Sequence, residues 1–221
     1  MGKPFVWSYS NLTSFELCPK KHYHEKIAKD VFQKTNDIQN YGKEAHKHFE
    51  NRMVKNKPLP MDLQHHEKTL ALLYNIPGKG LPEQKLALNG SFEPTGFFDS
   101  DVWCRGIVDY AKVKEGTNEL LVADWKFGRM QPGFDQIELM MAMMTSYMPE
   151  LTEYTGIYYW AKDKKITKTT LSVKEIPDVW SKFLPRVGHM EDSIVAGEFP
   201  AKRNFLCRKH CPVTKCPFHA E

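Results

Sequence analysis

Two aspartates and a lysine, Asp109, Asp124 and Lys126, interrupt the strand-like stretch GIVDYAKVKEGTNELLVADWKFG. The KEGTNE segment in its middle has the composition of a turn, which predicts two strands joined by a tight reversal. If the reversal pairs Val113 with Leu120, Asp109 lies opposite Asp124 across the ladder. Side chains alternate along a strand, so Lys126 points the same way as Asp124. The hairpin is therefore expected to gather three ionisable groups.

Carboxylates that face each other across a ladder repel and destabilise it unless a positive charge lies between them. A divalent cation meets that need, because it prefers hard oxygen ligands. Lys126 carries a single ammonium, which neutralises one neighbouring charge but cannot saturate two carboxylates. The alternative is an exposed strand face with an ordinary salt bridge. Three ionisable groups in this geometry favour the cation site.

The chain as a whole has the composition of a globular protein. Its 221 residues, 41% hydrophobic and 26% charged, suffice for one well-buried domain. The net charge is +4, and basic residues cluster in CPKKHYHEK, AKDKKITK and AKRNFLCRKHC, which favours a polyanionic partner such as nucleic acid. No N-terminal signal sequence is recognisable, and the apolar run LMMAMM is too short to span a bilayer. We therefore expect a cytoplasmic protein that does not associate with membranes.

Helical and strand-like segments alternate along the chain. The expected elements are helices over residues 8–29, about 38–54 and within 58–82, strands between about 83 and 127, a helix over 134–147, a hairpin over 152–173 and a closing helix over 172–199. The first helix is entered at Ser10 or Asn11 and interrupted by Pro19, and the closing helix is broken or kinked near Pro185. A loop, PGKGLP, separates the third helix from the first strand. This mixture favours an α/β or α+β core with a central mixed β-sheet flanked by helices.

An ordered set of short motifs runs through these elements. GKEAH ends at His46 in a helix, Glu83 heads a strand, GIVD ends at Asp109, DWK follows in the next strand, and Gln136 opens a helix. In this order they resemble the PD-(D/E)XK nucleases, most closely the RecB-like branch, which includes the CRISPR-adaptation nucleases and the nuclease domains of helicase-nucleases. The resemblance covers nearly the whole chain. It implies one nuclease domain over residues 1–221, with a restriction-endonuclease-like core and an N-terminal helical segment over about residues 1–80.

The resemblance implies a catalytic metal site. Asp109 and Asp124 would hold one or two Mg²⁺ or Mn²⁺ ions, with the Trp125 carbonyl and the His46 imidazole as further ligands. Imidazole suits Mn²⁺ better than Mg²⁺, which favours manganese. The alternative for His46 is a partly buried helix histidine without a ligand role, and His48 is expected to face away from the site.

Three other residues take accessory or catalytic roles by the same resemblance. Lys126 would position or deprotonate the attacking water, or offset charge on the phosphorane. Gln136 would contact DNA or orient Lys126. Glu83 is an accessory candidate, with a surface glutamate as its alternative. Many relatives carry tyrosine four residues after the glutamine, whereas this chain has Met140, in a run expected to pack in the core.

Four of the five cysteines have a distribution that favours a metal centre. Cys207, Cys211 and Cys216 form a C-terminal cluster over residues 207–216, and Cys18 lies near the N-terminus. Disulfides are not expected inside a cell, and exposed thiols among basic residues oxidise readily unless a metal binds them. Cys104 lies in a strand and is expected to be a small buried residue.

The identity of this metal centre has two readings. In the RecB-like pattern, one N-terminal and three C-terminal cysteines hold a [4Fe-4S] cluster that closes the domain. The alternative is a structural zinc bound by four thiolates, or by three together with His210 or His219.

The resemblance implies a metal-dependent deoxyribonuclease, acting as an exonuclease on single-stranded or frayed DNA ends in recombination, repair or replication. The chain has no G-x-x-x-x-G-K-[ST] motif for a helicase motor, so a helicase, single-strand-binding or recombination protein would act in trans. Two alternatives stay open: a catalytically inactive, cluster-stabilised DNA-binding adaptor, and an RNase.

Overall fold

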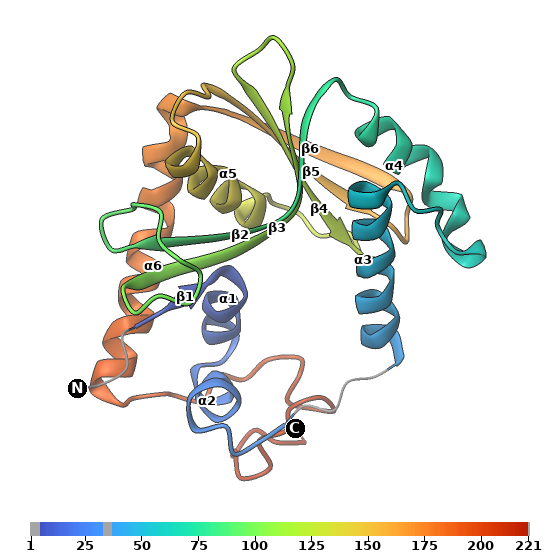
Figure 1. Cartoon of the computed structure of the whole chain (residues 1–221). Coiled ribbons are helices and arrows are strands. Elements are labelled where there is room, and N and C mark those ends of the chain that lie inside the picture. Colours follow the sequence, from blue (N-terminus) through green and yellow to red (C-terminus); the bar gives the residue numbers. More distant parts are fainter. Residues whose placement is uncertain (1–4, 33–36, 221) are drawn as a thin grey trace.

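The centre of the molecule is a mixed six-stranded β-sheet flanked by helices (Figure 1). The structure, a computed structural model, describes residues 5–32 and 37–220. The architecture confirms the predicted mixed α/β class with a central mixed sheet. Its strands are β1 (Trp7–Ser8), β2 (Gly78–Asn89), β3 (Val102–Lys114), β4 (Glu119–Lys126), β5 (Glu153–Trp160) and β6 (Lys165–Ser172).

The helices precede, interrupt and follow the strands in the predicted order. The α-helices are α1 (Tyr9–Leu17), α2 (Pro19–His22), α3 (Asp37–Lys55), α4 (Glu67–Tyr74), α5 (Asp135–Tyr147) and α6 (Ile176–Ala196). Shorter helical turns are η1 (Tyr23–Ala28), η2 (Met61–His66) and η3 (Val173–Glu175).

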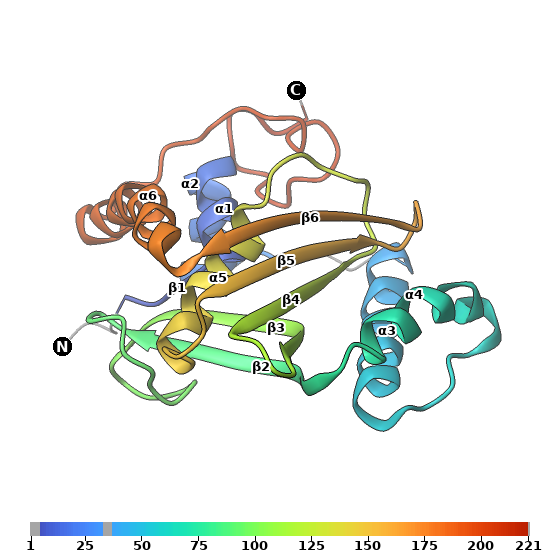
Figure 2. The same ribbon diagram turned by 90° about the horizontal axis from the view of Figure 1, so that it is seen from above.

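Helices cover both faces of the sheet (Figures 1 and 2). On one face α1, α5 and α6 form a core that includes Met141 and Phe183. On the other face α3 and α4 pack a second core that includes Phe49 and Trp125. Burial of these apolar side chains is the main source of stability, and it fixes the sheet between two helical layers.

The β3–β4 hairpin has the register that the sequence predicts. Val113 pairs with Leu120. Along β4, Val122 packs into the α5 side of the sheet and Ala123 into the α3 side. Side chains alternate on a strand, so Asp124 lies on the α5 side. The predicted faces of β4 are therefore confirmed.

One edge of β3 is shared by two strands that do not meet. β1 pairs in parallel with Cys104 and Arg105, whereas β4 pairs antiparallel with residues 110–113. β2 pairs along the opposite edge over the whole length of β3. Residues 106–108 therefore pair with β2 alone among the described strands, and the sheet opens between β1 and β4. The open stretch ends at Asp109.

Three local features differ from the sequence expectation. The first helix starts at Tyr9, capped by Ser8, whose hydroxyl accepts a hydrogen bond from the Asn11 amide at 3.3 Å. The expected entry at Ser10 or Asn11 was therefore wrong by two to three residues, because Ser8 already satisfies the first free amides. β1 was not predicted, since two residues are too short for a periodic signal. The break after the first helix lies at Pro19, as predicted.

The segment PGKGLP belongs to a strand and not to a loop. β2 begins at Gly78 and continues through Pro82, which lies opposite Tyr110. Proline is tolerated there because β2 pairs with β3 alone among the described strands, so the missing amide breaks no second ladder. Pro185 lies inside α6, which is assigned as one continuous helix rather than a broken one.

The C-terminal segment after α6 lies beside α1 and α2 (Figures 1 and 2). The Lys20 amide donates to the Pro200 carbonyl at 3.3 Å, and the Asn204 side chain donates to the Leu17 carbonyl at 3.1 Å. These contacts join the two ends of the described chain. Among the described helices, none combines the length and the apolar character needed to cross a bilayer.

Candidate active site

Asp109 and Asp124 occupy facing positions just beyond the last paired residues of β3 and β4, Tyr110 and Ala123. The Trp125 amide donates a hydrogen bond of 2.8 Å to Asp109 Oδ2 across the hairpin. Beyond the last backbone pair of the hairpin, the Asp109 side chain therefore takes the place of a backbone carbonyl as the acceptor from β4. The two predicted carboxylates are brought together as the register required.

Burial keeps both carboxylates reluctant to ionise. Burial first, and the neighbouring Asp124 carboxylate second, raise the pKa of Asp109 from 3.8 to about 8. The Trp125 amide and the Lys126 ammonium oppose that rise. Burial likewise raises the pKa of Asp124, against the attraction of Lys126. A bound cation would lower the pKa of both carboxyl groups, because it favours their charged forms.

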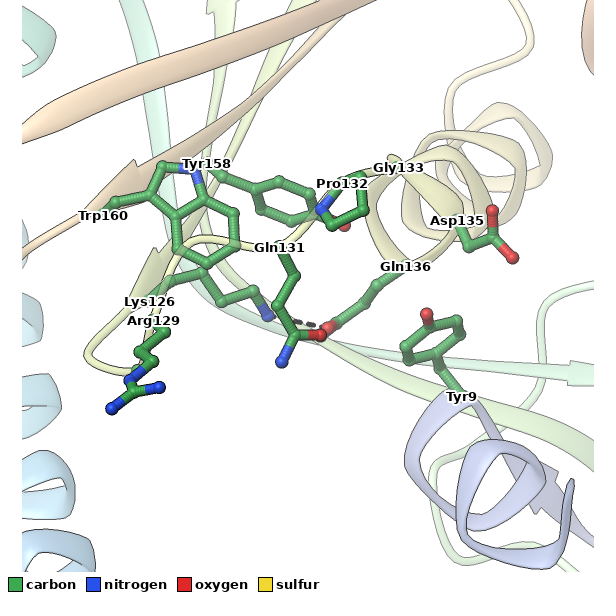
Figure 3. A pocket seen from close by; sticks show the side chains of 11 residues that line it. Tyr9, Lys126, Arg129, Gln131, Pro132, Gly133, Asp135, Gln136, Tyr158 and Trp160 are labelled. Atoms are coloured by element: carbon green, nitrogen blue, oxygen red, sulfur yellow. Dashed lines mark hydrogen bonds between the residues drawn. The ribbon is translucent and has the colours of Figure 1, made fainter. Parts of the chain in front are cut away.

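Lys126, Gln136 and Asp124 form a closed set of contacts. Lys126 Nζ donates to Gln136 Oε1 at 2.7 Å, as Figure 3 shows, and Gln136 Nε2 donates to Asp124 Oδ1 at 3.0 Å. Lys126 Nζ also lies 2.7 Å from Asp124 Oδ2. Gln136 lies in the first turn of α5, so this helix fixes the lysine and one carboxylate together.

Asp124 Oδ2 fits a metal ligand. This buried oxygen forms an ion pair with the Lys126 ammonium at 2.7 Å and accepts no hydrogen bond from another group of the described residues. A buried carboxylate oxygen whose close partner is a cation is suited to hold a metal ion in place of that cation. Within residues 5–32 and 37–220, however, no three His, Cys, Asp or Glu side chains form a ready-made metal site. Binding a cation here therefore requires the side chains to shift.

His46 approaches the carboxylates from α3. Its Nδ1 lies 3.5 Å from Asp109 Oδ2, and its ring packs against Phe127 with the centroids 5.0 Å apart. Burial lowers the pKa of His46, and the Lys126 ammonium lowers it further, whereas Asp124 and a hydrogen bond to the Trp125 backbone raise it. The imidazole is therefore neutral at physiological pH, which is the form that binds metals. His48 on the same helix is exposed.

Glu83 lies near the site and has a second glutamate beside it. Glu83 and Asp109 are the residues between two ladder pairs of β2 and β3, Pro82 with Tyr110 and Gln84 with Val108, and the Glu83 backbone has a φ of 42°. Its charge contributes to the raised pKa of Asp109. Burial first, and then a hydrogen bond and repulsion from Glu83, raise the pKa of Glu50, one turn after His46 on α3. The two glutamates extend the acidic side of the site.

Three cavities follow one another past Lys126. The central cavity, about 410 Å³, is lined by residues that include Tyr9, Lys126 and Gln136 (Figure 3). A cavity of about 450 Å³, the Arg105 cavity, shares Tyr9 and Gln136 with it. A third, of about 530 Å³, shares Arg129 with it. Neighbouring cavities therefore share residues in their walls, and we refer to the three together as the groove.

The central cavity combines aromatic rings with cations. Lys126 Nζ lies 5.1 Å from the centre of the Tyr158 ring, and the Phe134 ring stacks on the Tyr158 ring with the centroids 5.8 Å apart. Trp160 and Arg129 complete the wall, and Tyr9 faces them from α1 (Figure 3). Rings and cations together suit a chain of phosphates with flat bases.

The fold is shared with a solved structure. No family model matches the sequence, and none of the curated proteins matches it. The crystal structure of a "Putative exonuclease" from Eubacterium rectale matches over 96% of this chain and 88% of that chain, at 11% identity and a TM-score of 0.54. The crystal structure of SSO0001 matches over 98% of this chain and 88% of that chain, at 13% identity and a TM-score of 0.45. The first likeness shows a common fold.

Four cysteines meet at the second predicted site. Cys18, Cys207, Cys211 and Cys216 line one closed space of about 10 Å³ beneath the C-terminal segment. None of them forms a disulfide. Cys18 and Cys207 each accept a hydrogen bond from a backbone amide, at 3.5 and 3.4 Å. Burial raises the pKa of Cys211, as do the other three cysteines, against a hydrogen bond from the Val213 backbone.

The four cysteines line this space together, whereas neither His210 nor His219 does. Among the described residues they do not form a ready-made metal site, so binding a metal would require the sulfurs to move closer together. Cys104 lies apart in the core, fully buried, as predicted.

Several residues near the site were not found from the sequence. Glu50 had a weak signal, its spacing of four from His46, which places both on one helix face. Tyr9, Tyr158 and Trp160 had none, because core aromatics look the same in a sequence as aromatics that line a groove. Met140 is buried with its neighbours in the core, as expected for the MMAMM run.

Proposed function

We propose that this protein is a metal-dependent deoxyribonuclease of the PD-(D/E)XK type, related to the RecB-like branch. The observation that carries the proposal is the facing pair Asp109 and Asp124, with Lys126 two residues further along the same strand. Its support also includes Gln136, which contacts both Lys126 and Asp124. The common fold with the Eubacterium rectale protein, whose name describes an exonuclease, agrees with it.

Asp109 and Asp124 would hold Mg²⁺ or Mn²⁺, with His46 as a nitrogen ligand and the Trp125 carbonyl as a further oxygen. Bound there, the ion would polarise the phosphoryl oxygen and lower the pKa of the attacking water. His46 is suited to this role because its pKa is lowered by burial, which leaves the ring nitrogen free of a proton. Glu83 and Glu50 are close enough to influence the charge of the site.

Lys126 acts on the reacting phosphate or water. Its ammonium is held by Gln136 and lies at the wall of the central cavity, so it can orient the water or offset charge that develops on the phosphoryl oxygens. Gln136 is a positioning residue, because it acts through Lys126 and Asp124. The Tyr158 ring lies 5.1 Å from the same ammonium, in a cation–π contact that helps to hold it.

The substrate we propose is single-stranded DNA or a frayed end, cut by an exonuclease. The groove is lined by rings and by cations, including Tyr158, Trp160 and Arg129. Unpaired bases stack on such rings, whereas the bases of a closed duplex are not available to them. The four cysteines would hold a [4Fe-4S] cluster, or zinc in its place, and join the N-terminal helices to the C-terminal segment of the same domain.

End-labelled single-stranded DNA, duplex DNA and RNA, incubated in Mg²⁺, Mn²⁺ or EDTA, test the proposal. Wild type should cleave single-stranded DNA with either metal and not with EDTA. Lys126→Ala should lose at least about a hundredfold in rate. Lys168→Ala on β6, an exposed lysine, is the matched control and should behave as wild type.

The product ladder gives polarity and distinguishes exonuclease from endonuclease action. RNA cleaved in preference to DNA would make the protein an RNase. DNA bound in every condition but never cut would make it a binding adaptor and contradict the proposal.

A further inference from the structure

Beside the central cavity lies a second space with an arginine in its wall. The Arg105 cavity is lined by residues of β1, the start of α1, β3 and the loop before β3. It shares Tyr9 and Gln136 with the cavity that holds Lys126. It also includes Gly106 and Ile107, where β3 has no partner strand on one edge. The two cavities are therefore neighbours, separated by side chains that line both.

Arg105 forms no ion pair among the described residues. Its Nε is buried and makes no hydrogen bond, and no carboxylate in that part of the chain lies within 4.0 Å. Asp99 and Asp101 occur on the neighbouring loop, but they accept hydrogen bonds from Thr95 instead. A buried guanidinium nitrogen without a partner is costly unless a ligand supplies an acceptor.

Two phenylalanine rings flank the same guanidinium. Arg105 Cζ lies 5.3 Å from the centre of the Phe97 ring and 5.7 Å from that of Phe98. Phe98 is 81% exposed, so its ring is available to a second flat partner. Cation–π contacts hold both rings beside the Arg105 guanidinium, and Phe97 lines the cavity whereas Phe98 lies outside its lining.

The loop that carries these rings is fixed by its own hydrogen bonds. The Asn89 side chain accepts from the amides of Ser91 and Glu93 at 2.9 and 3.0 Å. Asp99 Oδ2 accepts from the Gly96 amide at 2.9 Å. Phe92 packs on Trp180 of α6, with ring centres 4.7 Å apart. Phe98 is therefore presented by an ordered loop, which reduces the entropy lost on binding.

We propose that the Arg105 cavity binds one nucleotide of the single-stranded DNA substrate, next to the phosphate that is cut. Arg105 receives the backbone phosphate, because a guanidinium with free donors matches phosphate oxygens. Phe98 stacks on the base, because base–aromatic stacking needs only an exposed flat ring. Ser8 and Ser10, which line the same space, supply hydroxyl groups to the sugar and phosphate. This assignment rests on the proposed nuclease function and gives it a defined subsite.

Three variants test the subsite in the full-length protein. Phe98→Ala removes the stacking ring, and Arg105→Gln removes the charge. Phe32→Ala is the matched control, because Phe32 is also 81% exposed but, unlike Phe98, has no cation–π contact with Arg105. Each variant is assayed for cleavage of a single-stranded oligonucleotide and of bis(p-nitrophenyl) phosphate, a small diester without a nucleotide chain. Binding in EDTA is followed with oligonucleotides that carry 2-aminopurine at successive positions.

The subsite predicts a split between KM and kcat. Phe98→Ala and Arg105→Gln should each raise KM for the oligonucleotide about 5- to 50-fold with kcat within about twofold of wild type, and leave diester hydrolysis unchanged. In wild type, 2-aminopurine fluorescence should be quenched at one position, and that quenching should be lost in Phe98→Ala and kept in Phe32→Ala.

Equal KM values and equal quenching in Phe98→Ala and Phe32→Ala would overturn the subsite while leaving the nuclease intact. If wild type binds DNA without cutting it, the nuclease proposal fails. The subsite is then tested by 2-aminopurine quenching alone: loss of quenching in Phe98→Ala supports it, and unchanged quenching overturns it. If wild type neither cuts nor binds DNA, both proposals fall.

Discussion

Asp109 and Asp124 face each other from β3 and β4, and the amide of Trp125 crosses the hairpin to Asp109 at 2.8 Å. The ladder thus delivers two carboxylates, the buried Asp124 and the partly buried Asp109, to the place where β3 loses its neighbour on one edge. Burial and mutual repulsion raise the pKa of Asp109 to about 8. Without a bound cation the two carboxylates lower the stability of the folded protein, which is typical of a functional site.

Replacing Asp109 by asparagine should stabilise the protein in EDTA. The pKa of Asp109 rises from 3.8 in the unfolded chain to about 8 in the folded one. Below pH 3.8 the Asp109 carboxyl is protonated in both states, and its contribution to stability is complete. As pH rises toward 8 this contribution is lost, because the carboxyl ionises in the unfolded chain while it stays protonated in the folded one. Asparagine does not ionise, so Asp109→Asn escapes this loss. The difference in Tm between Asp109→Asn and wild type should therefore be larger at pH 8 than at pH 5, by about 5 °C or more.

Differential scanning calorimetry measures this difference. Asp163→Asn, at an exposed aspartate between β5 and β6, is the control and should show no such growth. A Tm excess that stays constant with pH would show that Asp109 ionises normally in the folded protein.

Replacing Gln136 by alanine should slow cleavage without unfolding the protein. The amide holds Lys126 at 2.7 Å and Asp124 at 3.0 Å, so its loss frees both side chains from their orientation. Misplacement by about 1 Å costs about a hundredfold in rate. We expect kcat to fall about 10- to 100-fold, less than in Lys126→Ala, with little change in KM. Unchanged kcat would show that Gln136 orients neither group.

Replacing His46 by alanine should weaken the binding of Mn²⁺ more than the binding of Mg²⁺. The imidazole lies 3.5 Å from Asp109 Oδ2 and is neutral because burial lowers its pKa. Its loss should raise the Mn²⁺ concentration for half-maximal cleavage at least about tenfold. His48→Ala, two residues along the same helix and exposed, is the control. If both variants respond alike to Mn²⁺, His46 is not a ligand.

Replacing Cys18 by serine should empty the cysteine site. Cys18 lines the same closed space as three C-terminal cysteines, so its thiolate is expected to bind the same metal centre. We expect loss of the bound metal per chain, a Tm several degrees lower and faster proteolysis of the segment after α6. Iron, sulfide and visible absorbance in wild type would identify a cluster, whereas zinc in a colourless protein would exclude it.

Cys104→Ala serves as the control, because Cys104 is buried away from the other four cysteines. It should keep the wild-type metal content even if packing in the core is weakened. A Cys18→Ser protein that keeps its metal would show that Cys18 is not part of the centre.

The core of the site was predictable because it depends on local rules. The hairpin register follows from turn composition and strand alternation, so the facing of Asp109 and Asp124 could be derived from the sequence. The motif order added Gln136 and His46, which come from separate helices. Both meet the hairpin in the structure, within 3.0 and 3.5 Å of its carboxylates.

The rest depends on contacts between distant segments. β1 has two residues, too few for any periodic pattern, yet it defines one side of the open edge. The segment that contains Pro82 was predicted as a loop, because proline is rare inside sheets and the sequence does not reveal that β2 lies at an edge. The meeting of Arg105 with Phe98 depends on how the loop before β3 folds back, and loop conformation has no periodic signal in sequence.

The central claim is that Asp109 and Asp124 form a divalent-cation site, and direct Mn²⁺ binding tests it without requiring the right substrate. Free Mn²⁺ is titrated with wild type, Asp109→Asn, Asp124→Asn and the control Asp163→Asn, and is followed by electron paramagnetic resonance. We predict that wild type and the control bind at least one Mn²⁺, and that both site variants lose this binding. No binding by wild type, or equal binding by Asp124→Asn, would contradict the account.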